Sequence, residues 1–210
     1  MFYGAYQRVH GLFGNTACET RGEPTEAELA LLTPFKTSLP PATLGPMAPF
    51  VCQLLTEMHA LMGECDAPVV DHLCYRAATL PEYLALKETL ARHGVLLVEG
   101  MIGGRPIATY RLHQPVCWQQ VTVPCIELAA PKAGRAHQAG LEHIELVVPS
   151  LPALVAAHPG LAFKTANMDD GRNPDVGLML PSGQIKFHLR PLSEVIDEEL
   201  HTGAVVPVPA

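Results

Sequence analysis

Residues 70–130 and residues 141–190 share one order of predicted secondary structure: strand, helix, strand, strand, strand. A short sequence similarity marks the same repeat. Asp71-His72-Leu73 and Glu142-His143-Ile144 each place a histidine between an acidic and an apolar residue, 71 positions apart. This spacing is longer than a solenoid repeat and suits a duplicated module. We therefore expect an α+β fold with two tandem βαβββ modules, one over about 69–130 and the other over about 141–190.

The elements of each module follow from apolar alternation and from helix end signals. The expected strands are residues 69–77, 95–101, 107–112 and 119–129 in the first module, and 141–148, 161–165, 176–180 and 184–190 in the second. A helix over 81–93 has proline in its first turn and ends at Gly94, and a short helix follows Ser150. Gly103-Gly104 predicts a hairpin turn, and Pro124 predicts an edge or a bulge in the fourth strand.

The chain outside the modules differs in composition. Twenty of its 210 residues are proline, and six of these lie within the first 49 positions. We expect residues 1–46 to form a Pro-rich, irregular extension in which only Thr25-x-x-Glu28 predicts a capped helix, ended by Pro34. Apolar residues spaced three and four apart then predict a helix that ends near Gly63. The main domain should cover residues 47–192, and residues 193–210 should form a short helix and a tail.

Charge and composition argue against several classes of function. The formal net charge is −7, so an acidic surface disfavours binding to nucleic acid. The chain contains no run of eighteen apolar residues that predicts a membrane span, and its first residues do not resemble a secretory signal. The six cysteines are scattered and form no C-x-x-C pair. We therefore expect reduced cysteines and a cytoplasmic protein.

Ionisable side chains gather on one face of the predicted strands, because side chains alternate between the two faces of a strand. Those faces carry His72 and Arg76 on the first strand of module one, Glu127 on its last strand, His143 and Glu145 on the first strand of module two, and Lys186, His188 and Arg190 on its last strand. The opposite faces are apolar. Polar faces of this kind commonly do no more than meet water, which is the alternative to a functional site.

Four of these residues form the donor set of a metal site. His72 and Glu127 lie at the start and end of module one, and His143 and His188 take the matching places in module two. If the two modules curl and pair, all four side chains point into one cavity. Imidazoles with a carboxylate suit a divalent first-row ion such as Zn, Fe, Mn, Ni or Co. The sequence contains no nucleophile elbow, phosphate-binding loop, H-E-x-x-H or dinucleotide fingerprint that would indicate another chemistry.

Several segments resemble one known family in order and spacing. They are Asp71-His72-Leu73-x-x-Arg76, Glu99-x-Met101-Ile102-x-Gly104-Arg105-Pro106-Ile107, Leu112-His113-x-Pro115, Ile126-Glu127-Leu128-x-x-Pro131, Gly140-x-Glu142-His143-Ile144-Glu145, Lys164-Thr165, Asn173-Pro174 and Ile185-Lys186-Phe187-His188. Over residues 50–192 the chain resembles the YecM family, a bacterial group placed with the vicinal oxygen chelate superfamily of glyoxalase I and the extradiol dioxygenases.

The resemblance implies paired βαβββ modules that form a half-open, barrel-like mixed sheet around one divalent metal ion. In that superfamily the ligands lie on the first and last strands of each module, which carries this role over to His72, Glu127, His143 and His188. Superfamily members more often have glutamate where His188 stands, so Glu145, on the face of His143, is the alternative ligand.

The expected function is metal-dependent chemistry on a small oxygen-bearing metabolite, of the lyase, isomerase or dioxygenase type. The metal would stabilise an enolate as a Lewis acid or support metal-bound oxygen chemistry, with Glu127 or Glu145 moving the proton. The candidates for holding a substrate carboxylate are Arg76, Arg105, Lys186 and Arg190. Surface pairing is the alternative role for these cations, and closing the hairpin turn is the alternative for Arg105.

Three other functions stay open at this point. The protein could sequester the same ligand unchanged, it could bind an organic anion without metal, or its Pro-rich leader could dock a partner. As partners we expect a small-molecule ligand and a second copy in a homodimer, with neither nucleic acid nor a membrane.

Overall fold

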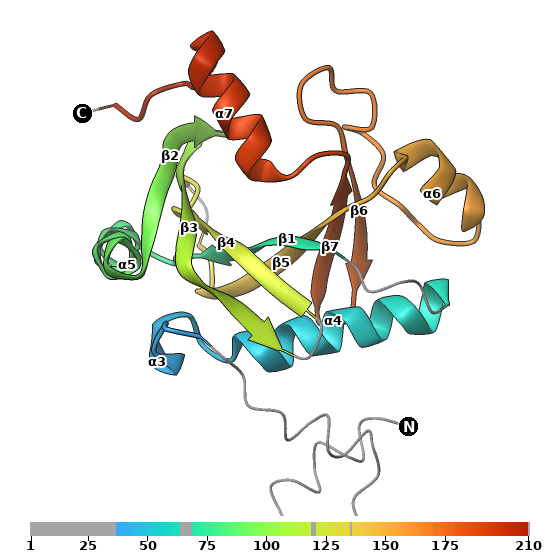
Figure 1. The fold of residues 1–210 in the computed structure, drawn as a ribbon, viewed down its shortest axis with the longest axis horizontal. Coiled ribbons are helices and arrows are strands. Elements are labelled where there is room, and N and C mark those ends of the chain that lie inside the picture. Colours follow the sequence, from blue (N-terminus) through green and yellow to red (C-terminus); the bar gives the residue numbers. More distant parts are fainter. Residues whose placement is uncertain (1–36, 64–68, 119–120, 135, 210) are drawn as a thin grey trace, which may run out of the picture. The chain divides into compact units, whose positions relative to one another are not determined.

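The computed structural model describes residues 37–63, 69–118, 121–134 and 136–209. These residues form an α+β fold around one strongly curved, seven-stranded sheet in the order β2-β3-β4-β1-β5-β7-β6 (Figure 1). The strands are β1 (Val70–Arg76), β2 (Gly94–Ile102), β3 (Arg105–Trp118), β4 (Val121–Ala129), β5 (Gly140–Val147), β6 (Asp175–Leu180) and β7 (Gly183–His188). Each lies close to a strand that alternation predicts.

Both modules of the predicted repeat are present, and they meet at their first strands. In module one β1 pairs in parallel with β4, and in module two β5 pairs in parallel with β7. The antiparallel pairing of β1 with β5 joins the two halves into one sheet. The predicted strand at 161–165 is wrong: only a single bridge between Lys164 and Gly177 remains there. One bridge at the outer side of β6 leaves that segment as loop.

The hairpin and the proline both lie where the sequence places them. Gly103 and Gly104 take positive φ angles of 57° and 80° in the turn between β2 and β3, a region of backbone space that glycine enters without steric cost. Pro124 lies in β4, an inner strand, opposite the register shift in β3 between Arg111 and Val116. The missing N–H of the proline therefore falls at a bulge, which confirms that part of the prediction.

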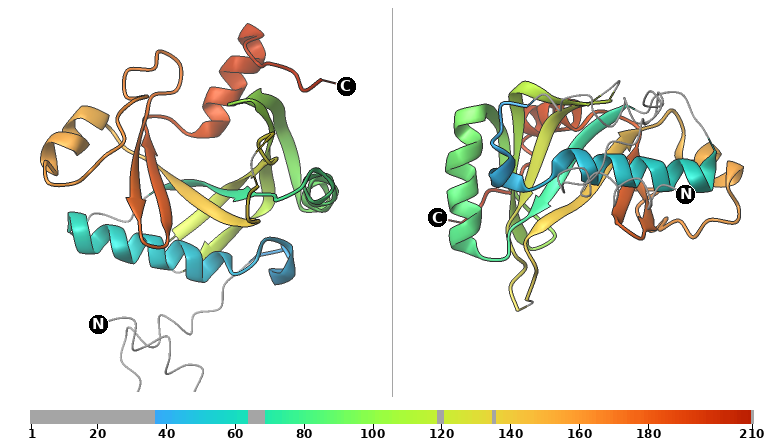
Figure 2. Two further views of the ribbon diagram at one scale, coloured as in Figure 1. Left: turned by 180° about the vertical axis from the view of Figure 1, so that it is seen from behind. Right: turned by 90° about the horizontal axis from the view of Figure 1, so that it is seen from below.

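Helices cover the outer, convex face of the sheet (Figure 2). α4 (Met47–Met62) packs against β5, β6 and β7, and α5 (Leu80–His93) packs against β2, β3 and β4. Thr79 caps the start of α5: its side chain accepts a hydrogen bond from the Glu82 N–H, and a proline lies in the first turn. The short helix α6 (Leu151–Ala157) is capped in the same way by Ser150. The inner, concave face is thereby left for the ionisable residues.

The C-terminal residues lie on the open side of the curved sheet. α7 (Leu192–Thr202) lies across from α4, between the end of β2 and the ends of β6 and β7 (Figure 1). Its Val195 and Ile196 are buried. The predicted short C-terminal helix is therefore present, beginning one residue earlier than expected.

The described part of the N-terminal extension joins the core. The short helix α3 (Pro41–Leu44) precedes α4, and the side chains of Leu39 and Leu44 are each 1% exposed. The helix predicted from Thr25 lies outside the described residues, as do Cys18 and Cys65. Four cysteines within the described residues, Cys52, Cys74, Cys117 and Cys125, are free. Among the described residues, no helix is both long and apolar enough to cross a membrane.

Candidate metal centre

A β-bulge at the start of β1 brings two site residues to the same place. Val70 pairs with Leu146 and His72 pairs with Glu145, so Asp71 is an extra residue in β1 at this point. A bulge re-aims side chains that would otherwise alternate. The Oδ2 atom of Asp71 lies 2.8 Å from Nδ1 of His72, and both residues are buried. The carboxylate therefore fixes the imidazole with its Nε2 atom directed away from Asp71.

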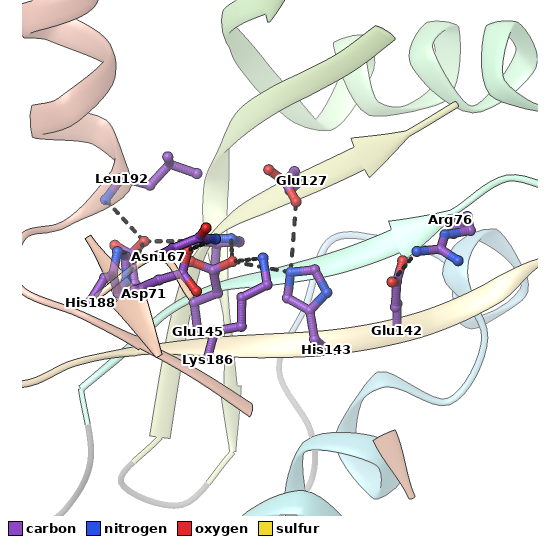
Figure 3. Close-up of polar contacts among 12 residues, drawn as sticks. Asp71, Arg76, Glu127, Glu142, His143, Glu145, Asn167, Lys186, His188 and Leu192 are labelled. Carbon is purple, nitrogen blue, oxygen red and sulfur yellow. Dashed lines mark hydrogen bonds and ion pairs between the residues drawn. The ribbon is translucent and has the colours of Figure 1, made fainter. Parts of the chain in front are cut away.

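Glu145 stands at the centre of the polar cluster on the concave face (Figure 3). Its Oε1 atom lies 3.2 Å from Nε2 of His143, 3.5 Å from Nε2 of His72 and 2.7 Å from the Nζ atom of Lys186. Strand pairing produces this convergence, because His72 and Lys186 flank Glu145 in register on the neighbouring strands β1 and β7. Residues from three strands thus share one carboxylate.

Glu127 and His188 lie on opposite sides of this centre. Oε2 of Glu127 is 3.8 Å from Nε2 of His143. His188 lies beside Asp71 and Glu145, with its Nε2 3.6 Å from Asp71 Oδ2 and its Nδ1 3.9 Å from Glu145 Oε2. The ring centroid of His72 is 6.3 Å from that of His143 and 6.0 Å from that of His188. The fold therefore gathers His72, Glu127, His143 and His188 in one cluster, with Glu145 among them.

The buried carboxylates control the charge of the site. Burial lowers the pKa of a histidine, but the charge of Glu145 and the hydrogen bond to Asp71 outweigh it and raise the pKa of His72 to about 10. Burial raises the pKa of Glu145, but His72, His143 and Lys186 hold it well below its usual range. For His188 burial prevails and lowers the pKa. The cluster strongly favours bound positive charge.

The residues present fit a divalent cation. Ligand atoms of His72, His143 and Glu145 lie within 4.8 Å of one another, and so do those of Asp71, His72 and His188. Among the described residues, Nε2 of His72 and both ring nitrogens of His188 are buried without a hydrogen-bond partner. Native proteins rarely leave buried polar atoms without a hydrogen bond, so a bound ligand is expected to satisfy these nitrogens. Imidazole and carboxylate together are borderline donors that suit Zn, Mn, Fe, Co or Ni.

The four predicted substrate-binding cations have different surroundings. Lys186 is paired with Glu145, and Arg76 is paired with Glu142 (Figure 3). Arg190 forms an exposed pair with Glu198 on α7, at 2.6 Å. Arg105 is only 9% exposed, and its Nε and Nη1 atoms have no hydrogen-bond partner among the described residues. Arg105 also pairs with Ile102 beside the hairpin turn, so both its turn role and the role of all four in binding a substrate stay predictions.

Sequence reasoning missed Asp71 as a member of the cluster. Strict alternation puts Asp71 on the face opposite His72, because no local signal marks the bulge. Cys74 lies on the concave face in register with Glu127 and His143. Burial raises the pKa of the Cys74 thiol well above its usual value, so this cysteine is not an activated nucleophile.

Comparison with known proteins gives the chain its family. The family model described as YecM protein matches residues 43–170, more than half of the sequence. The chain belongs to the YecM family. The relative Protein YecM of Escherichia coli is 30% identical over 165 residues, which cover 69% of this chain and 86% of that protein. An uncharacterized protein of Haemophilus influenzae is 34% identical over 83 residues, covering 40% of this chain and 44% of that one.

A solved structure shares the fold with this YecM-family chain. The structural-genomics structure of Protein EC4020 superposes with a TM-score of 0.60 at 28% identity and covers 72% of this chain and 88% of its own. Membership of the YecM family and the α+β fold of two paired modules, both expected from the sequence, are thereby confirmed, with module two one strand short of the expected βαβββ order. The YecM match spans β1 to β5 and therefore includes His72, Glu127, His143 and Glu145, while Lys186 and His188 lie beyond it.

Proposed function

We propose that this YecM-family protein binds one divalent first-row metal ion on the concave face and acts there on a small, carboxylated, oxygen-bearing metabolite. His72, His143, Glu127 and Glu145 would hold the ion, with His188 as the adjoining histidine. One observation carries the proposal: buried imidazole nitrogens without hydrogen-bond partners face a shared carboxylate in a cluster that favours positive charge. A vicinal oxygen chelate arrangement of paired modules supports it.

The contacts of each residue indicate its role in the proposed chemistry. When bound, a divalent ion supplies a Lewis acid that stabilises negative charge on a substrate oxygen. Glu145 is held by Lys186 and two imidazoles and keeps its charge. Glu127 has only a contact of 3.8 Å to His143 and is 13% exposed, so of the two proposed carboxylate ligands it is the one that could leave the ion and take up a proton. Glu127 is therefore our candidate for the proton shuttle.

Arg105 is our candidate for holding the carboxylate of the substrate. It lies on β3 on the face of Thr109, which pairs with Glu127. Arg105 and Thr109 are four positions apart in the strand, about 13 Å along the sheet. A buried guanidinium with unpaired N–H groups binds a carboxylate well, because it can donate two parallel hydrogen bonds. A homodimer remains part of the proposal.

Metal content tests the proposed function. Protein expressed with added zinc, manganese, iron, cobalt and nickel and then purified is expected to carry about one divalent ion per chain by elemental analysis. Protein without stoichiometric metal would instead favour an anion-binding member of the family. Candidate 2-oxo and 2-hydroxy acids are then incubated with the loaded protein. Recovery of a chemically altered compound indicates an enzyme, and recovery of a bound but unchanged compound indicates a sequestering protein.

Replacing Arg105 with methionine is expected to stabilise the ligand-free protein by about 1 kcal/mol, because it removes a buried cation whose N–H groups are unpaired. The same change should abolish the rise in melting temperature that a carboxylated ligand gives the unmodified protein. Arg92→Met, at an exposed position on α5, is the matched control and should change the melting temperature little. A destabilised Arg105→Met protein that still binds such ligands would assign Arg105 a purely structural role.

A further inference from the structure

Asp71 has contacts that the proposed chemistry does not use. Its Oδ2 atom accepts a hydrogen bond from Nδ1–H of His72 at 2.8 Å and another from the backbone N–H of Leu192 at 3.0 Å (Figure 3). Asp71 is 5% exposed, so water does not compete freely for this oxygen. Leu192 is the first residue of α7. One buried carboxylate oxygen therefore joins a proposed metal ligand to the beginning of the C-terminal helix.

The far end of the C-terminal segment is attached to β2, in the same module as Asp71. The carbonyl oxygen of Val206 accepts a hydrogen bond from the N–H of Met101 in β2 at 2.8 Å. The neighbouring Gly100 allows this approach, because a Cβ atom at that position would lie 3.3 Å from both Val205 Cγ1 and Val206 O. Residues 192–206 thus start at Asp71 of β1 and end on β2, and they extend along the open side of the curved sheet (Figure 1).

We propose that Asp71 is a positioning residue that couples cation binding at His72 to the seating of α7 over the site. The coupling rests on the proposed metal site. A ligating histidine that donates its other N–H to a carboxylate is a common support for a metal, and here the same carboxylate oxygen also holds the helix. Coupling between two sites is reciprocal. A bound cation therefore raises the equilibrium constant for seating α7 by the same factor by which a seated α7 raises the affinity of the site for the cation.

Leu192→Pro tests the coupling, because it removes the N–H donor without touching Asp71. The backbone accepts proline here: Pro191 has φ −56° and ψ 138°, the conformation favoured before a proline, and Leu192 opens the helix. Leu192→Ala, which keeps the N–H, is the matched control. Calorimetric titration with zinc should show affinity about fivefold weaker or more in L192P than in L192A. Zinc should slow amide hydrogen exchange in residues 192–202 of L192A by the factor that separates the zinc affinities of the two variants. Zinc should leave the exchange of the same residues in L192P unchanged.

Equal zinc affinity and equal exchange in the two variants would overturn the coupling. If L192P does not fold, Asp71→Asn is used in its place. Asp71→Asn should bind zinc more weakly than the unmodified protein and should show faster amide hydrogen exchange in α7. A change in zinc affinity without a change in exchange, or the reverse, overturns the proposal. A wild-type protein that binds none of zinc, manganese, iron, cobalt and nickel contradicts the proposed function alone. The coupling is then decided by the nitrogen-15 resonances of the His72 ring, which should differ between L192P and L192A; identical resonances overturn it.

Discussion

Replacing His143 with alanine is expected to abolish stoichiometric zinc binding. His143 lies with its Nε2 atom 3.2 Å from Glu145 and 3.8 Å from Glu127, so it joins the two carboxylates proposed as ligands. Loss of a supporting residue outside the ligand set typically costs 10- to 100-fold in metal affinity, and loss of a ligand should exceed about 100-fold. Competition between the protein and a zinc chelator measures the change.

The controls for this variant separate lost ligation from lost packing. His143→Gln keeps most of the buried volume and should also lose zinc, whereas His93→Ala, on α5 at the outer face, should bind zinc as the unmodified protein does. Zinc should raise the melting temperature of the control and leave that of His143→Ala unchanged, because an ion stabilises only a folded state that binds it. Unchanged zinc affinity in His143→Ala would show that the ligands lie elsewhere.

Glu145→Gln is expected to lower the free energy of unfolding of the metal-free protein by about 3 kcal/mol, because removing one partner of a buried ion pair leaves the other charge uncompensated. The Glu145 side chain is 8% exposed and Lys186 is 28% exposed, so the ammonium group of Lys186 loses its counter-charge in a largely dry environment. Urea denaturation in the presence of a chelator gives the measurement, since urea leaves ionic strength unchanged.

A double-mutant cycle with Lys186→Met isolates this interaction. The double variant E145Q/K186M should be more stable than the sum of the single losses predicts, by about 1–3 kcal/mol. Glu198→Gln with Arg190→Met is the matched exposed pair, with side chains 58% and 43% exposed, and its coupling should stay below about 1 kcal/mol. Equal coupling in the two pairs would mean that the central cluster is not organised by charge.

Much of the candidate site could be predicted because strand alternation is a local property. Each of His72, Glu127, His143 and His188 is followed by an apolar residue, and a side-chain period of two places it on the polar face whatever the strand pairs with. The central position of Glu145 could not be found in this way. It depends on β1 and β7 flanking β5 in one register, which brings His72 and Lys186 to either side of Glu145.

The sequence by itself determined the duplicated module, the polar faces of the strands and most of the helix ends, because apolar periodicity and capping residues act over a few neighbouring positions. Only the tertiary structure decided the bulge that turns Asp71 toward His72, the reduction of residues 161–165 to a single bridge, and the seating of α7 on Asp71. These features arise from hydrogen bonds between residues far apart in the chain, such as Asp71 and Leu192, whose pairing no local pattern encodes.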